Sequence, residues 1–199
     1  LGVVRASSFT ELLETLKLFC ISGGLASRRL GVLTCSGADS VMLADLAAPL
    51  GVELPPLSEA QMADMREYMA GFVNLTNPLD FNTQVWGRSE LEVRCFTSVM
   101  QGEQYDATAL VHDYPLAERS DPAAWDGVCN SFIEAHRRVG KPAVLISNVG
   151  ESLPRDARER LRASGVTPLA GLPDGMAAVR HAGWYGERRR ALLEGESGA

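Results

Sequence analysis

The residues best placed to do chemistry lie where an apolar segment gives way to small and polar side chains. The continuous apolar run at 30–35 predicts a buried strand, and residues 38–50 predict a helix that is apolar nearly all round. At such a junction the first N–H groups of the helix have no partner within it and point beyond the carboxyl end of the strand. The turn therefore predicts a seat for a phosphate or another anion. Its members are Ser36, Gly37, Ala38, Asp39 and Ser40.

Asp39 leaves more than one interpretation of this turn open. A carboxylate at a helix start satisfies the free N–H groups and the helix dipole by itself, and it repels an incoming phosphate. In one alternative the Asp39 side chain points away and leaves the seat free. In the other it replaces the anion. A tight strand-to-helix turn without any ligand is the simpler structural alternative.

A second loop, Asn77-Pro78-Leu79-Asp80, is predicted to adjoin the turn. Pro78 favours an extended conformation at Asn77, so the backbone holds the Asn77 amide in place. The Asp80 carboxylate can accept backbone N–H groups and fix the loop. A purely structural turn is an equal alternative for these residues.

Other site chemistries find no support in the spacing. The four cysteines, Cys20, Cys35, Cys95 and Cys129, form no C-x-x-C pair, and each lies in an apolar segment. We expect them to be buried, reduced thiols. The three histidines are isolated, so we predict no metal site, and no arrangement typical of nucleophilic catalysis is present. We accordingly predict no catalytic residue in this chain.

Composition restricts the class of protein. A chain of 199 residues with 46% hydrophobic residues fits one globular domain with a proper core. Its net charge of -6 gives no general attraction to nucleic acid or to an anionic membrane surface. No apolar run reaches the roughly 20 residues of a membrane helix, and no signal peptide is present, so we expect a cytoplasmic protein. Because the chain starts with Leu1, we expect residues 1–199 to be a fragment of a longer protein.

Strands and helices are predicted to alternate along the chain. Capping boxes open helices at Ser8 and Ser58, and Leu12, Leu13, Leu16 and Phe19 follow the first one at helical spacing. Residues 74–81 read as irregular. The alternation predicts a three-layer α/β/α fold with a five-stranded, mainly parallel sheet, and ligands bind such sheets beyond the carboxyl ends of the strands. The strands are expected at 30–35, 52–54, 107–111, 143–147 and 166–170.

Three segments in order carry a resemblance to a known family. They are residues 34–45 (TCSGADSVMLAD), 51–58 (GVELPPLS) and 77–80 (NPLD). Together they resemble the flavodoxin-like C-terminal ligase domain of the NDP-forming acyl-CoA synthetases, which are relatives of succinyl-CoA synthetase. The opening residues 1–12 also resemble the entry to that domain, so the resemblance covers nearly the whole chain. It implies a single flavodoxin-like CoA-ligase domain over residues 1–199.

The resemblance implies a reaction in which an acid, CoA and ATP give acyl-CoA, ADP and phosphate. It proceeds through an acyl phosphate and a phosphohistidine. The phosphohistidine, the CoA site and the ATP-grasp nucleotide site belong to other domains of the same or a partner chain, so this domain binds no cofactor itself, whereas the full-length enzyme uses ATP with Mg and CoA. Carried over to this chain, Ser36–Ser40 face the phosphohistidine, and Asn77 and Asp80 form the adjoining loop. Ala38 and Ser40 depart from the family pattern, which often has glycine at both places.

A second function class stays open beside the ligase. Asp39 favours a non-catalytic flavodoxin-like binding or interaction module that has lost the phosphate role, whereas the three ordered motifs favour the ligase. A dinucleotide-binding flavoprotein is a third alternative, although the turn is not G-x-G-x-x-G. Homo-oligomerisation is compatible with either of the first two.

Overall fold

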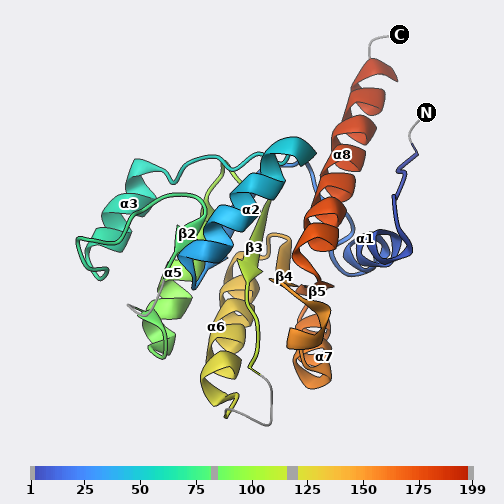
Figure 1. Ribbon diagram of the computed structural model, residues 1–199. Coiled ribbons are helices and arrows are strands. Elements are labelled where there is room, and N and C mark those ends of the chain that lie inside the picture. The colour runs from blue at the N-terminus through green and yellow to red at the C-terminus, as the bar shows by residue number, and fades with distance from the viewer. Residues whose placement is uncertain (1–2, 82–84, 116–120, 197–199) are drawn as a thin grey trace.

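A parallel sheet forms the centre of the computed structural model, which describes residues 3–81, 85–115 and 121–196. Within these residues the sheet has five strands in the order β2-β1-β3-β4-β5, and every neighbouring pair is parallel. The predicted α/β fold with its flavodoxin-like strand order is confirmed, and Figure 1 shows helices flanking the sheet. The strands are β1 (Leu30–Thr34), β2 (Leu79–Asp80), β3 (Ala107–Val111), β4 (Ala143–Ser147) and β5 (Thr167–Ala170).

Helices cover both faces of the sheet with apolar side chains. One core lies between the sheet and α3, α5, α6 and α7, and the other lies between the sheet and α2 and α8, with α1 adding Leu18. The helices are α1 (Phe9–Ser22), α2 (Gly37–Leu50), α3 (Glu59–Arg66), α5 (Ser89–Gln101), α6 (Ala123–Val139), α7 (Arg155–Ala163) and α8 (Leu172–Glu196), with a 3-10 turn η1 (Gly150–Ser152) before α7.

The three central strands are buried along their whole length. Their register places Leu33 beside Leu110, and Leu110 beside Leu145, on the face covered by α5 and α6. Val32, Ala109 and Val144 are paired in the same way on the opposite face. Burial on both faces explains why these strands are continuous apolar runs without alternation.

One predicted strand is wrong. The segment 52–54 makes only an isolated bridge, between Glu53 and Arg29, and the strand at this edge is Leu79–Asp80, within the stretch that reads as irregular. Pro55 and Pro56 explain the failure, because neither has an N–H with which to extend the ladder. The other four strands lie within one or two residues of their predicted bounds.

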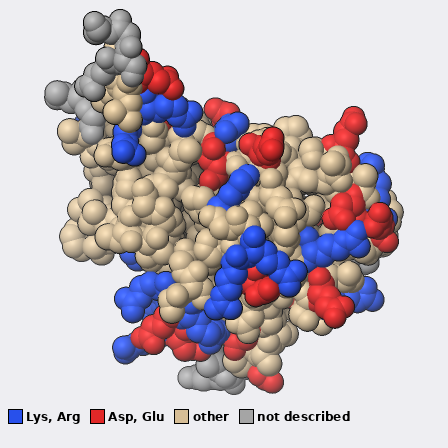
Figure 2. Space-filling model, turned by 180° about the vertical axis from the view of Figure 1, so that it is seen from behind, with Lys and Arg blue, Asp and Glu red and all other residues tan. Residues whose placement is uncertain are grey.

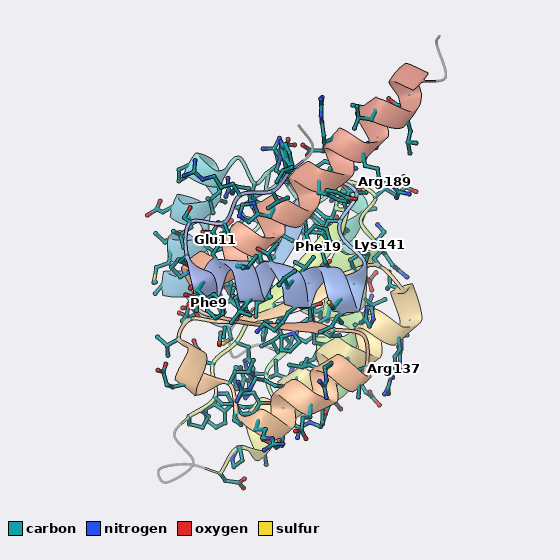
Figure 3. The ribbon with its side chains drawn as sticks, turned by 90° about the vertical axis from the view of Figure 1, so that its right-hand side faces the viewer. Phe9, Glu11, Phe19, Arg137, Lys141 and Arg189 are labelled. Carbon is teal, nitrogen blue, oxygen red and sulfur yellow. The ribbon has the colours of Figure 1, made fainter. Side chains whose placement is uncertain are left out.

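Helix α1 lies along the β5 edge of the sheet and packs on α8 (Figures 1 and 3). The Glu14 carboxylate accepts a hydrogen bond from the Ala170 N–H at 2.9 Å, and Ser22 Oγ lies 2.8 Å from Thr167 Oγ1. Because polar side chains of α1 face the sheet, Cys20 is on the outer side and exposed. The prediction that every cysteine is buried is therefore wrong for Cys20, and Cys35 is only half-buried, although all four thiols are free.

Candidate functional site

The first turn of α2 is the centre of the candidate site. Ser36 is the N-cap in extended conformation, and its hydroxyl accepts a hydrogen bond from the Asp39 N–H at 3.4 Å. The Ser40 N–H closes the first helical bond to the Ser36 carbonyl. Among the described residues, the N–H groups of Gly37 and Ala38 have no hydrogen-bond partner. Two donors at the positive end of a helix are thus available at the carboxyl end of β1.

The Ser40 side chain faces back toward the strand. Its hydroxyl lies 2.7 Å from Thr34 Oγ1 and donates to the Ser36 carbonyl at 3.3 Å. These bonds tie the first turn of α2 to the end of β1. Ser40 therefore stiffens the turn through its side chain.

Asp39 points away from its own helix start, toward the loop after β4. Its Oδ1 accepts a hydrogen bond from Asn148 Nδ2 at 2.9 Å, and the same amide donates to Asp113 Oδ2 at 2.5 Å. Asp113 also accepts from the Asn148 N–H at 2.9 Å and from the Ser152 hydroxyl. Of the two alternatives for Asp39, the geometry matches the one in which its side chain turns aside, because Ser36 provides the cap.

Asp80 and Asn77 end up in different places. Asp80 of β2 pairs with Thr34 of β1, and its Oδ2 lies 3.6 Å from the position that a Cβ would occupy on Gly37. Asn77 lies lower along β1, where its amide accepts from the Val32 N–H at 2.9 Å and donates to the Leu30 and Pro55 carbonyls at 2.8 Å each. Asp80 therefore lies beside the turn, whereas the Asn77 amide is hydrogen-bonded to the edge of the sheet.

The electrostatics of the turn are mixed. Burial, with the carboxylates of Asp113 and Asp80, raises the pKa of Asp39, although the Asn148 hydrogen bond opposes this rise. Burial and the Asp39 carboxylate raise the pKa of the Cys35 thiol to about 11, so this thiol is not a nucleophile near neutral pH. The carboxylates of Asp39, Asp80 and Asp113 therefore affect one another at the carboxyl ends of the strands, and Asp80 lies beside Gly37.

Sequence reasoning missed Asp113 and Asn148. Asp113 lies two residues after β3, and Asn148 follows β4 directly. Since the carboxyl ends of parallel strands share one edge, their positions already carried a signal. The network with Asp39 could not be anticipated, because it depends on how the two loops cross above the sheet.

The histidine at the end of β3 does not enter this site. His112 is 1% exposed, its Nε2 lies 3.2 Å from the Trp125 carbonyl, and its ring contacts Trp86 and Tyr114. Burial lowers the pKa of His112 to about 4, so the ring is neutral at physiological pH. Among the described residues, no group of three or more His, Cys, Asp or Glu side chains is arranged to hold a metal ion. In the same part of the chain, every helix is too short or too polar to cross a membrane.

The sequence is similar to a curated acid–thiol ligase over part of its length. The ADP-forming acetate–CoA ligase of Methanocaldococcus jannaschii is 27% identical over 79 residues, which are 40% of this chain and 11% of that protein. No protein-family model matches the chain. The similarity is weak, and the matched protein is of the same enzyme class that the three sequence motifs resemble.

Solved structures match the fold over nearly the whole chain. A Pyrococcus horikoshii OT3 protein has a TM-score of 0.79 at 19% identity and covers 94% of this chain. The dinucleotide-forming acetyl-coenzyme A synthetase 1 of Ca. Korarchaeum cryptofilum, in complex with phosphate and ADP, has a TM-score of 0.77 at 18% identity and covers 98%. The chain spans only 42% and 40% of the lengths of these two solved chains.

Proposed function

We propose that this chain is a domain of an NDP-forming acyl-CoA synthetase, which converts an acid, CoA and ATP into acyl-CoA, ADP and phosphate. The observation that carries the proposal is agreement between two comparisons. A stretch of the sequence is similar to an ADP-forming acetate–CoA ligase, and the fold matches part of an acetyl-coenzyme A synthetase. The matched proteins are far longer than this chain, which supports separate domains for CoA, for the nucleotide and for the phosphohistidine.

Within that enzyme, the role proposed for Ser36–Ser40 is to face the phosphohistidine carried by another domain. The free N–H groups of Gly37 and Ala38 can donate to phosphoryl oxygens, in the manner of other helix starts. Asn148 supports this role, because it holds the Asp39 carboxylate toward the β4 loop and so leaves the helix start uncovered. The Asp80 carboxylate beside Gly37 can accept an N–H from an incoming imidazole.

The alternative is a non-catalytic binding or interaction module. The observation that favours it is the set of three carboxylates around the helix start, Asp39, Asp80 and Asp113, which repel a free phosphate. A module of this kind binds no phosphoryl group. Its turn only joins β1 to α2.

Removing a single N–H group separates the two functions. Gly37 is the first residue of α2 and follows Ser36, whose backbone is extended at φ -147° and ψ 127°, so Gly37→Pro removes a donor without disturbing the helix. In the full-length ligase we expect the rate of phosphoryl transfer, measured as ADP release with CoA and a panel of acids, to fall by at least ~10-fold, as for a lost oxyanion donor. The melting temperature should change little.

The matched control is Glu59→Pro at the first residue of α3, which also follows a serine N-cap with extended backbone. It should leave both rate and melting temperature unchanged. Full activity in Gly37→Pro would contradict the phosphoryl contact proposed for this turn, whereas a wild-type full-length protein without ligase activity would favour the binding module. Residues 1–199 alone should form no acyl-CoA, and measurable synthesis by this chain would contradict the assignment of the phosphohistidine and nucleotide sites to other domains.

A further inference from the structure

A small cavity lies between the N-terminal segment and helix α8. Its volume is about 260 Å³, and its walls include the basic side chains of Arg5, Arg28, Arg180 and His181. Among the described residues, no aspartate or glutamate lines it. Figure 1 shows the N-terminal segment, in dark blue, running beside α8 toward α1. On the face that Figure 2 shows, basic and acidic side chains are interspersed, so basic walls without acidic ones set this cavity apart from that surface.

Two parts of the fold hold most of these basic side chains in place. Arg180 and Trp184 are four residues apart on α8, so they lie on the same side of that helix, and both line the cavity. Arg28 precedes β1 and is fixed by Glu187 of α8. The Glu187 carboxylate accepts from Arg28 Nε at 3.1 Å and lies 3.0 Å from Arg28 Nη2. Arg28 therefore has a carboxylate of its own, which lies outside the cavity walls.

The other basic groups have less negative charge than they need. Arg180 and His181 share one carboxylate oxygen, because Glu11 Oε1 lies 3.3 Å from Arg180 Nη2 and 2.5 Å from His181 Nε2. The Nε of Arg180 is buried without a hydrogen-bond partner. Arg5 is exposed, and it has no hydrogen-bond or ion-pair partner among the described residues. The cavity therefore carries at least one uncompensated positive charge, and an anion inside it would compensate this charge.

The size and walls of the cavity define the kind of occupant. A volume of about 260 Å³ is below the roughly 300–1,000 Å³ of sites for drug-sized ligands, so a nucleotide is too large. Trp184 and Leu50 add apolar wall beside the arginines. Guanidinium groups bind carboxylates and phosphates through parallel N–H groups. A small molecule with an anionic head and an apolar body matches both kinds of wall.

We infer that this cavity, called the arginine pocket below, binds a small organic anion. Its carboxylate or phosphate head pairs with Arg5 and the neighbouring arginines, and its apolar part packs against Trp184. Leu50 is the last residue of α2 and Gly37 is the first, so the arginine pocket lies about 20 Å along that helix from the candidate site. The inference is therefore independent of the proposed ligase reaction.

Titration followed by NMR tests the arginine pocket directly. The chain has three tryptophans, and Trp184→Phe identifies the indole N–H signal of Trp184 among them. Benzoate and phenyl phosphate, added separately to the full chain, should shift this signal, and the tighter of the two identifies the head group. Benzamide has the shape of benzoate without its charge, so it should leave the signal in place.

Substitution of Arg5 tests whether its charge holds the anion. Arg5→Gln should raise the Kd of the tighter probe at least ~10-fold, because it removes a charged donor. Arg5→Lys keeps the charge without the planar fork and should give an intermediate Kd. Neither variant should change the melting temperature, since Arg5 is exposed and unpartnered. The matched control is Arg188→Gln, at an exposed arginine of α8 outside the pocket, and it should bind like the wild type.

Three results would overturn the inference. The first is a Trp184 signal that neither anionic probe moves at millimolar concentrations, as expected if the arginines only contact an acidic group of another domain. The second is an equal shift with benzamide, which would show that the charge is irrelevant. The third is a Kd that Arg5→Gln leaves unchanged.

Discussion

At one edge of the sheet an amide side chain completes the backbone hydrogen bonding, whereas at the other edge a carboxylate does. Strand β2 pairs only with Leu33 and Thr34, so the first half of β1 needs other partners. Glu53 supplies two backbone bonds, and Asn77 then accepts from Val32 and donates to Leu30. At this edge, the backbone of Glu53 and the side chain of Asn77 together take the place of a longer strand.

The β5 edge is covered by a helix instead of a strand. Glu14 of α1 accepts from the Ala170 N–H, and Ser22 meets Thr167 by its hydroxyl. A carboxylate only accepts, and it carries charge, so this edge needs neighbouring cations such as Lys17. Covering an edge in this way also prevents pairing with another chain. A neutral amide can therefore take the place of part of a strand, whereas a carboxylate at a sheet edge also needs a cation nearby.

The largest effect should come from the β1 edge. Asn77→Ala removes three hydrogen bonds and leaves the Val32 N–H without its partner, so we expect a loss of about 3 kcal/mol in the free energy of unfolding, at about 1 kcal/mol for each bond. Urea denaturation measures this loss. Asn74→Ala, at an exposed asparagine of the same loop, is the control and should change stability by less than about 0.5 kcal/mol. Equal losses in both variants would contradict the role given to Asn77.

Removing the side-chain partner at the β5 edge should cost less free energy of unfolding. Glu14→Ala leaves the Ala170 N–H without its charged acceptor, and we expect a loss of about 2 kcal/mol in the free energy of unfolding. Glu14→Gln keeps an acceptor oxygen at this place and should recover about half of that loss. If Glu14→Ala costs more than Asn77→Ala under the same conditions, the ranking of the two edges is wrong.

The smallest expected effect is the loss of stability on substituting Glu11 of α1, and this loss should depend on pH. Burial raises the pKa of Glu11, but the hydrogen bonds from His181 and Ser7 outweigh it and leave the pKa below its usual range. A carboxyl whose pKa is lowered in the folded state stabilises above its unfolded pKa, and this stability is lost as pH falls through the folded pKa. Glu11→Gln should therefore cost about 1 kcal/mol at pH 7 and much less well below pH 4.

Stability curves at several pH values test this difference. The cost of Asn77→Ala should stay constant over the same range, because its amide does not titrate. A cost of Glu11→Gln that does not shrink in acid would show that Glu11 acts there by packing alone.

Local patterns predicted most elements because their causes are local. The apolar run at 30–34 is a strand because both faces are covered, and Ser36 and Ser58 cap helices through bonds to nearby N–H groups. The segment 52–54 shows the limit. Its strand-like composition was overruled because Pro55 and Pro56 end the ladder and Asn77 takes up the remaining groups of β1.

By itself, the sequence determined the alternation of elements, the parallel sheet and a helix that begins close after the first strand, because these depend on neighbours along the chain. Only the tertiary structure decided where Asp39 and α1 point. Asp39 turns to Asn148, which is distant in the sequence. The helix α1 has apolar spacing that fits either orientation; the β5 backbone bonds Glu14 and α8 bonds Glu11, so both glutamates lie inward and the leucines stay outside. Such choices depend on which polar groups would otherwise be buried without partners, and that is known only once the chain has folded.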